Sequence, residues 1–136
     1  VGNVSQIWLN GTTSTAFFSS MSMNLNNGLR SQDAIGSLAH VGIALGSLEV
    51  GGDISIYFED KTMYDLYIGA ADFSLAFAMQ DNAGNTYIFT LPRVKFESGN
   101  VASGGLNSDV MFDAGWKAIA DSTTNCMVQM DKIAGV

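Results

Sequence analysis

The sequence contains few of the residues that disulfide frameworks and metal centres require. Among its 136 residues there are one cysteine, one histidine and one proline. The single cysteine, Cys126, excludes an intrachain disulfide framework, and the single histidine, His40, excludes a metal site built from two or more imidazoles. The composition therefore does not favour a secreted, disulfide-stabilised domain, and we expect no metal and no cofactor.

Basic residues are also scarce. Six lysines and arginines stand against thirteen acids, which gives a net charge of −7, and the bases form no cluster. A specific nucleic-acid interface needs a basic patch to neutralise phosphates, so the sequence argues against tight DNA or RNA binding. The acids are spread along the chain and do not form a tail. No apolar run approaches the ~20 residues that a membrane-spanning helix needs, so no membrane partner is expected.

Apolar residues make up 47% of the chain, which is enough for the core of one domain over residues 1–136. The most informative stretch lies just before its middle. Apolar and polar residues alternate from Ile54 to Phe58, which predicts a strand. Apolar residues then recur at helical spacing from Lys61 to Ile68, with the acids Glu59 and Asp60 before them and Gly69 after them. This pattern predicts one short helix.

Most other patterned segments alternate and predict strands. We expect seven or eight strands, over residues 6–9, 17–25, 47–50, 54–58, 73–79, 87–96, 110–117 and 126–132. Residues 81–85 are expected to form a hairpin loop, and Pro92 to break the ladder or mark an edge. Cys126 is expected to be a small apolar side chain in the last strand. The fold class is therefore mainly β, with the lone helix packed on its flank.

Two segments are expected to be loops. Residues 30–46 contain glycines that interrupt any long helix, and we expect an extended loop with at most one helical turn. Its apolar content is unusual for a solvated loop and predicts that it packs against a neighbour; these apolar residues are Ile35, Leu38, Val41, Ile43 and Leu45. Residues 98–108 are rich in glycine, serine and asparagine and predict a mobile loop.

No catalytic signature accompanies the candidate chemical groups. His40 has no nucleophile motif near it in the sequence. The carboxylate pairs are Glu59 with Asp60, explained as charges at the helix N-terminus, and Asp109 with Asp113, whose separation in space the sequence does not give. Five aromatic residues could form a sugar-stacking platform, but their spacing favours core or interface positions; the residues concerned are Trp8, Tyr57, Tyr64, Tyr67 and Trp116. The sequence therefore does not favour an enzyme.

The order of several segments resembles the tail tube (major tail) proteins of long-tailed bacteriophages. The resemblance rests on Asn26-Asn27-Gly28-Leu29-Arg30, a glycine-punctuated segment to Gly46, residues 51–60 leading into Met63-Tyr64, and Leu91-Pro92-Arg93-Val94-Lys95. It covers residues 17–132 and lies in order and spacing, not in one diagnostic motif. It implies an antiparallel β-sandwich or split barrel with one flanking helix, and a virion protein of the phage tail that assembles in the host cytoplasm.

The resemblance also implies what this protein assembles into. Subunits form rings that stack into a hollow tube, and inner strands join into a continuous barrel whose acidic lumen lets DNA pass without specific binding. The expected contacts between subunits or rings involve Arg30, Ile35, Leu38, Val41, Ile43, Leu45, Asn100 and Leu106. Some of five acids are expected to face the lumen: Asp53, Asp72, Asp109, Asp113 and Asp131. Expected partners are the chain itself and the tape measure, tail terminator and distal tail proteins.

Several alternatives stay open. Related tube proteins can have two domains, and this chain, which begins with Val1 and not with Met, is then expected to be the C-terminal domain. The ring is then either a hexamer or a trimer of two-domain subunits. A different class of protein, a carbohydrate- or ligand-binding β-sandwich, is the second interpretation. A hydrolase that uses a carboxylate pair is the third.

Overall fold

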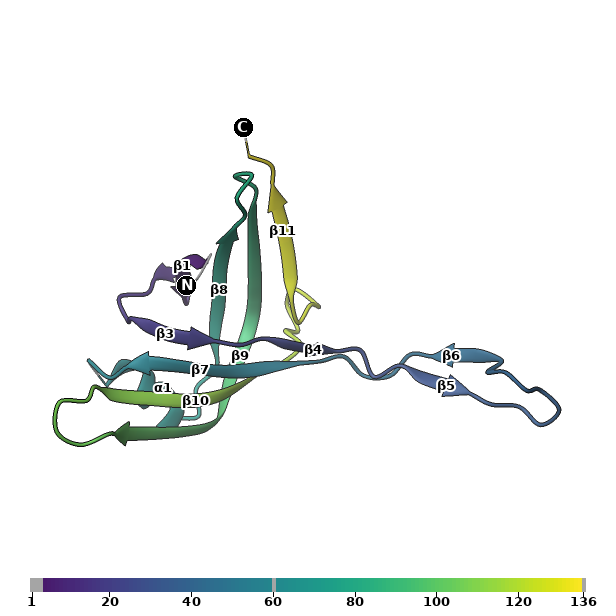
Figure 1. Cartoon of the computed structure of the whole chain (residues 1–136), viewed down its shortest axis with the longest axis horizontal. Coiled ribbons are helices and arrows are strands. Elements are labelled where there is room, and N and C mark those ends of the chain that lie inside the picture. The colour runs from purple at the N-terminus through teal and green to yellow at the C-terminus, as the bar shows by residue number, and fades with distance from the viewer. Residues whose placement is uncertain (1–3, 60, 136) are drawn as a thin grey trace.

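The computed structural model describes residues 4–59 and 61–135 and consists mainly of antiparallel β-sheet with one short helix (Figure 1). Nine strands form one sheet in the order β2-β1-β8-β9-β10-β7-β3, with β4 paired to β7 and β11 paired to β9. The remaining two strands, β5 and β6, form a separate hairpin. The elements are β1 (Val4–Leu9), β2 (Thr12–Thr13), β3 (Phe18–Met21), β4 (Asn24–Asn26), β5 (Arg30–Gln32), β6 (Gly42–Ala44), β7 (Glu49–Tyr57), α1 (Thr62–Ile68), β8 (Phe73–Gln80), β9 (Thr86–Ser103), β10 (Val110–Ala118) and β11 (Gln129–Ile133). The expected mainly β class with one helix is confirmed.

The long strand β9 divides the sheet into two parts. Its first half pairs with β8 on one edge and with β11 on the other, and its second half pairs with β10. We call β3, β4, β7, β10 and residues 94–103 of β9 subsheet A. We call β1, β2, β8, residues 86–94 of β9 and β11 subsheet B. Figure 1 shows the two subsheets running steeply across each other.

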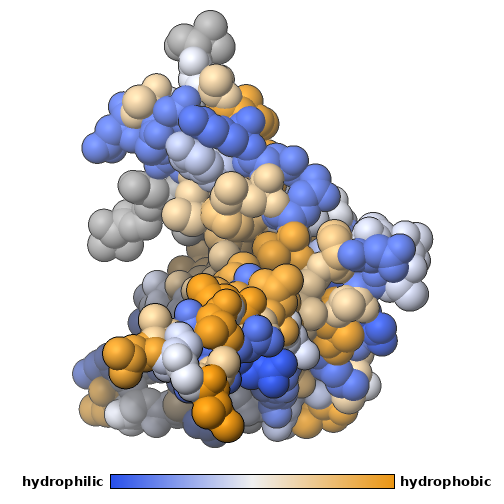
Figure 2. Space-filling view, turned by 90° about the vertical axis from the view of Figure 1, so that its right-hand side faces the viewer, coloured by the Kyte–Doolittle hydropathy of each residue, from blue (hydrophilic) through white to orange (hydrophobic). Residues whose placement is uncertain are grey.

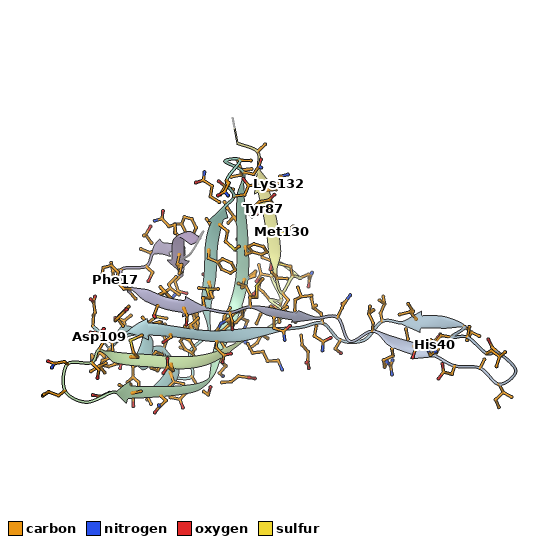
Figure 3. All side chains as sticks on the ribbon, in the orientation of Figure 1. Phe17, His40, Tyr87, Asp109, Met130 and Lys132 are labelled. Atoms are coloured by element: carbon orange, nitrogen blue, oxygen red, sulfur yellow. The ribbon has the colours of Figure 1, made fainter. Side chains whose placement is uncertain are left out.

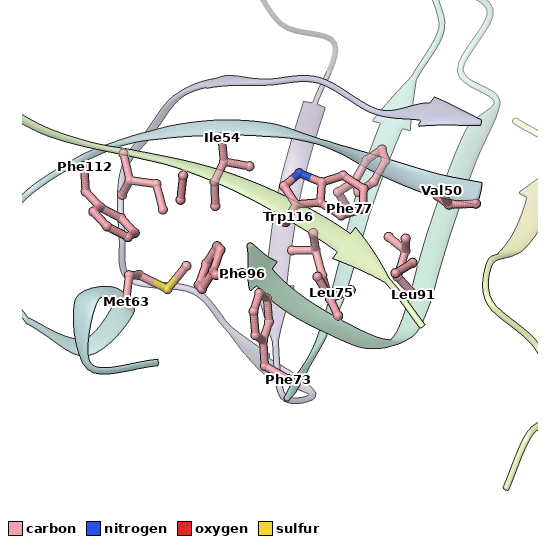
Figure 4. Close-up of a cluster of buried hydrophobic side chains, with 14 residues drawn as sticks. Val50, Ile54, Met63, Phe73, Leu75, Phe77, Leu91, Phe96, Phe112 and Trp116 are labelled. Atoms are coloured by element: carbon pink, nitrogen blue, oxygen red, sulfur yellow. The ribbon is translucent and has the colours of Figure 1, made fainter. Parts of the chain in front are cut away.

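The hydrophobic core lies between the two subsheets, because each strand turns alternate side chains toward it. β7 and β10 contribute buried apolar residues at every second position, and β8 and β9 supply the opposing layer. Figure 4 shows these side chains meeting in one cluster, with Trp116 near its centre. The buried members include Val50, Ile54, Ile56, Phe73, Leu75, Phe77, Leu91, Val94, Phe96, Phe112, Ala114 and Trp116.

The helix α1 packs on β9 and on the core side of subsheet A. Met63 is buried, and Tyr64 and Tyr67 lie beside Phe112 with ring centroids 6.1 and 6.3 Å away. The expected helix is thus confirmed, although Asp60 lies outside the described residues and the acid in the first turn is Asp65. Gly69 ends the helix with an ordinary helical φ, and the left-handed residue is Ala70, with φ 47°.

The expectation that Pro92 breaks the ladder or marks an edge is confirmed in part, because β9 is continuous from Thr86 to Ser103 but its registers with β8, β10 and β11 give Pro92 no partner. Pro92 lies between the residues of β9 that pair with β11 and those that pair with β10. It also lies opposite a register irregularity in β8, so no neighbouring strand needs the N–H that proline lacks. The expected loop over residues 98–108 is wrong for residues 98–103, which belong to β9. Residues 98–103 pair with β10. Gly99 lies under the ring of Tyr67, where a side chain would collide.

Four further expectations are corrected. Residues 17–25 form two short strands, β3 and β4, interrupted where the Ser22 hydroxyl accepts the backbone N–H of Asp53 at 2.9 Å. Residues 47–57 contain one strand, β7, which runs through Gly51 and Gly52. Cys126 precedes β11, because its carbonyl accepts the N–H of Asp121 and closes a turn. The described residues contain eleven strands, more than the seven or eight expected.

Candidate assembly surfaces

The face of subsheet A that points away from the core is polar. Register pairs Asp53 with Gly115 and Asp113 with Ser55, and the Ser55 hydroxyl donates to Asp113 Oδ1 at 2.5 Å. Because β7 and β10 alternate strictly, these residues share one face while Ile54 and Ala114 face the core. We call this surface the polar face. It brings together two of the five acids expected at a lumen, Asp53 and Asp113.

The polar face is hollowed and bears more negative than positive charge. An open groove of about 630 Å³ lies on it, with walls from β4, β7, β9 and β10. Glu49 and Glu97 line this groove as well, two acids that are not among the five expected at a lumen. Lys117 lies in the same groove, and Lys95 is its register partner on β9. The face thus carries four carboxylates and two lysines.

The other three candidate acids lie elsewhere. Asp72 forms an ion pair with Arg93, at 2.7 Å, in the turn between α1 and β8. Asp109 lies just before β10, at the end of the sheet (Figure 3). Asp131 lies on β11, where it accepts a hydrogen bond from the Gln129 amide at 2.9 Å. The structure therefore does not bring the five acids together into one cluster.

Residues 28–46 form an arm that projects from the end of subsheet A (Figure 1). The expected extended loop is instead a hairpin of β5 and β6, with one hydrogen-bonded turn at its tip, where the Ser37 N–H donates to the Ala34 carbonyl. Exposed fractions show that the predicted apolar residues are uncovered in the single chain: Leu38 111%, Ile35 109%, Leu45 76%, Ile43 71% and Val41 59%. Figure 2, which views the molecule from the arm side, shows apolar side chains grouped over the lower half of that face. The arm is an apolar surface without a core beneath it.

The hairpin of the arm has two different faces. Ser31 pairs with Ile43, and alternation puts Leu29, Val41 and Leu45 on the same face as this pair. Arg30 pairs with Ala44 and Gln32 with Gly42, so the opposite face is polar or small. We call the first the apolar face of the arm. A two-stranded ribbon of this kind is marginally stable alone and gains stability when one face is covered.

The arm joins the sheet at a narrow neck. Gly28, with φ 56°, and Gly46 touch through their backbones, and a Cβ on Gly46 would lie 2.1 Å from the Gly28 carbonyl oxygen. Only glycine fits this approach. Near the tip, the imidazole of His40 contacts the carboxylate of Asp33 across the hairpin loop. This contact links the two sides of the hairpin loop, so it gives His40 a structural role in the arm.

Asn100 and Leu106, the remaining predicted contact residues, lie away from the arm. Asn100 pairs with Asp113 on the polar face. Leu106 lies in the loop between β9 and β10 and is 96% exposed. Figure 3 shows Asp109, in the same loop, at one end of the molecule and His40 at the other. The two segments expected to contact neighbours thus occupy opposite ends of subsheet A.

The geometry offers little for catalysis or sugar stacking. Trp116 is 2% exposed and belongs to the core, so it cannot stack on a sugar. The described residues hold no group of three or more side chains suited to a metal ion, and none of their helices is long and apolar enough to cross a membrane.

The pKa of Asp81 is lowered by a hydrogen bond from the Asn85 amide, and the pKa of Asp121 by the Thr124 backbone N–H. Both carboxylates stabilise turns.

Subsheet A has two edges that no other described strand covers. One is formed by β3 and β4, which pair only with β7 in the described part of the chain. The other is the side of β9 residues 95–103 that faces away from β10, because β8 pairs with β9 no further than Val94. Exposed strand edges pair readily with other strands unless they are protected.

Uncovered edges, an apolar arm and a polar sheet face define a class of protein: a structural subunit that assembles with other chains. Residues 1–118 match the sequence profile of a family described as phage tail tube protein, and the chain belongs to this family. It is a structural, non-enzymatic component of the phage tail, and tail tube proteins assemble with copies of themselves. No curated protein matches the chain.

Proposed function

We propose that copies of this chain join edge to edge through subsheet A into rings, that the rings stack into a tube, and that DNA passes through the lumen. The observation that carries this proposal is the pair of uncovered edges on opposite sides of subsheet A. An interface between two different edges of the same chain is heterologous and closes into a ring when the rotation permits it.

Strand direction supports this arrangement. Successive pairs in subsheet A are antiparallel, so β3 runs opposite to β7, β10 opposite to β7, and β9 opposite to β10. β3 and the second half of β9 therefore run in opposite directions. Rotation about an axis along the strands preserves each direction, so β9 of one copy meets β3 of the next as an antiparallel partner. The antiparallel order of the strands then continues around the ring without a break.

The polar face supports a lumenal position. In such a ring the core, subsheet B and α1 lie on one side of the joined sheet, and the polar face lies on the other. Glu49, Asp53, Glu97 and Asp113 give this surface a net negative charge over its two lysines. Negative charge at a wall repels phosphates and disfavours the counterion release that drives DNA binding. DNA then slides without being held.

The arm supports contact between rings. It extends roughly along the strands of subsheet A (Figure 1), which is the direction of the proposed tube axis. About eight residues separate the neck from the tip, so at roughly 3.3 Å per residue the arm reaches about 26 Å. This length suffices to reach the adjacent ring, where its apolar face can be covered. Arg30 lies on the arm's opposite face.

The remaining parts of the assembly are proposals of the same kind. We infer that the end rings contact the tail terminator and distal tail proteins and that the lumen holds the tape measure protein during assembly. The assignment of this chain as the C-terminal domain of a two-domain subunit stays a prediction, which the intact mass of the tube protein from virions tests together with peptide mapping that locates residues 1–136 within it. End-on averages of the rings then decide between a hexamer and a trimer of two-domain subunits.

Electron microscopy of the purified chain across a concentration series, with light scattering, tests the proposal. Rings or tubes with a central hole are expected. A strictly monomeric particle at every concentration contradicts it. The double charge reversal Asp53→Lys with Asp113→Lys then tests the lumen: its tubes should retain DNA, whereas reversal of Asp131 to lysine should not change DNA retention.

A further inference from the structure

The core-facing side of subsheet B continues beyond the part of the molecule that covers it. Figure 3 shows Tyr87, Met130 and Lys132 on strands that rise past β3 and β4, the uncovered edge of subsheet A. Register places Met130 beside Phe89, and Tyr87 beside both Met79 and Lys132. Phe89 stacks on the buried ring of Phe77, so all these residues extend the core-facing side. We call this surface the overhang.

The overhang is apolar and only partly covered within the chain. Met130 is 61% exposed and Met79 36% exposed, while Tyr87 and Phe89 are half-buried. Lys132 places its Nζ 5.7 Å from the centre of the Tyr87 ring. An apolar surface continuous with the core, beside an uncovered strand edge, indicates that another chain completes it.

We propose that the overhang of one copy covers the helical flank of the next copy in the ring, the segment formed by α1 and the following turn, residues 62–72. This inference rests on the proposed edge-to-edge ring. In that ring the neighbour's β9 lies against β3 and β4, directly beside the overhang. A joined sheet keeps the same side facing the core in both copies, and α1 packs on that side of β9.

The dimensions agree with this placement. Residues 86–90 of β9 extend about 17 Å at roughly 3.3 Å per residue, and neighbouring strands lie about 4.8 Å apart. The overhang therefore spans more than three strands of the adjacent copy. Measured across the strands, α1 lies within this reach, since Tyr64 and Tyr67 lie beside Phe112 on β10, the second strand from the joined edge.

The chemistry of the two surfaces also agrees. The helical flank exposes Ile68, at 62%, beside half-buried Leu66 and Tyr67. Its acids Asp65 and Asp72 already pair with Lys61 and Arg93, at 3.6 and 2.7 Å, so the flank brings ion pairs and no excess negative charge to the contact. The complementarity therefore lies in the apolar side chains of the two surfaces, and these ion pairs and Lys132 lie around them.

Two residues of β11 provide a matched pair of variants. Met130 lies on the overhang, and Ile133, 55% exposed, lies on the opposite face of the same strand. Met130→Asp should raise the concentration needed for ring formation by roughly tenfold or more, because it buries a carboxylate in the interface. Ile133→Asp should leave that concentration unchanged. Both side chains are exposed in the single chain, so both variants should keep the melting temperature of the monomer.

Photo-crosslinking locates the contact directly. Replacement of Tyr87 by p-benzoylphenylalanine should yield crosslinks between copies that map to residues 62–72, and the same replacement of Asp131, on the opposite face, should not. Rings that form normally with Met130→Asp, or crosslinks from position 87 that map elsewhere, overturn this inference and leave the proposed function intact. An unaltered chain that forms no rings overturns both.

Discussion

The arm gives the sharpest test of stacking, because it can be altered without disturbing the core. Ile43 lies on the apolar face of the arm and is 71% exposed, so the substitution Ile43→Asp should leave the free energy of unfolding within about 0.5 kcal/mol of its original value. If the apolar face is buried against the next ring, loss of one isoleucine contact removes about 2 kcal/mol per arm. At 1.4 kcal/mol per tenfold, this weakens each contact roughly 30-fold.

The effect accumulates because every subunit of a ring contributes one arm. Even three arms per junction would lose about 6 kcal/mol, if each loses about 2 kcal/mol. The expected result is that Ile43→Asp yields rings but few or no tubes. Sedimentation velocity with electron microscopy measures the proportion of rings and tubes, and circular dichroism confirms the fold.

A control on the other face of the same hairpin makes the result specific. Gln32 pairs with Gly42 on the polar face of the arm, so Gln32→Asp introduces the same charge without removing an apolar contact. It should form tubes at nearly the original concentration. Deletion of residues 35–45 should abolish tubes and leave the domain folded. Tubes of normal length from Ile43→Asp would refute the role assigned to the apolar face.

Three further predictions concern single backbone or turn positions. Gly46→Ala forces the neck apart, because the new Cβ collides with the Gly28 carbonyl, so tube yield should fall while the melting temperature of the core stays within a few degrees. Ala70→Gly relieves the left-handed conformation at φ 47° and should raise the free energy of unfolding by up to about 1 kcal/mol in urea titration. Asp81→Asn should destabilise the domain at neutral pH but not in strong acid, since the folded pKa of Asp81 is lowered, mainly by the Asn85 amide, and its stabilisation is lost as pH falls through that pKa. Urea titrations in a series from pH 7 down into strong acid measure this difference, and a difference that does not shrink as the pH falls would contradict it.

Much of the fold could be predicted from hydrophobic periodicity, because the core is built from side chains at alternate positions of the strands. Ile54 and Ile56 are buried at alternate positions of β7, as the sequence pattern predicts. The helix was equally visible, since Met63 begins an apolar spacing of three and four residues. Both signals are local, so they survive in a single sequence without knowledge of the partner strands.

Features set by distant residues were not predictable in this way. The second half of β9 is rich in glycine, serine and asparagine, which favours a loop locally, yet it is a strand because β10 pairs with it. Gly99 fits there because its missing side chain leaves space for the ring of Tyr67, a residue more than thirty positions earlier in the chain. The arm was expected as an apolar loop with a neighbour, and its hairpin follows from cross-strand pairing that composition does not encode.

The candidate surfaces show the same division between local and distant information. Asp53 and Asp113 occupy polar positions of their strands, but only the pairing of β7 with β10 puts them on one face. Glu49 shares the alternation of Asp53 and could have been selected by the same reasoning. Glu97 lies at a register shift between β9 and β10, where alternation fails, so no sequence signal reveals its place beside the groove.

In the proposed tube, each exposed feature of the single chain has a different role. Uncovered edges and apolar surfaces promote aggregation when they lie at random, because any copy can add to any other. Here the two edges of subsheet A differ from each other and run antiparallel, so joining them adds copies in one direction and closes a ring. The arm projects along the other direction and adds rings. The polar face contributes to neither contact, and its negative charge is left to face the lumen. Changes to the overhang should therefore impair rings, changes to the arm should impair stacking, and changes to the polar face should alter DNA passage alone.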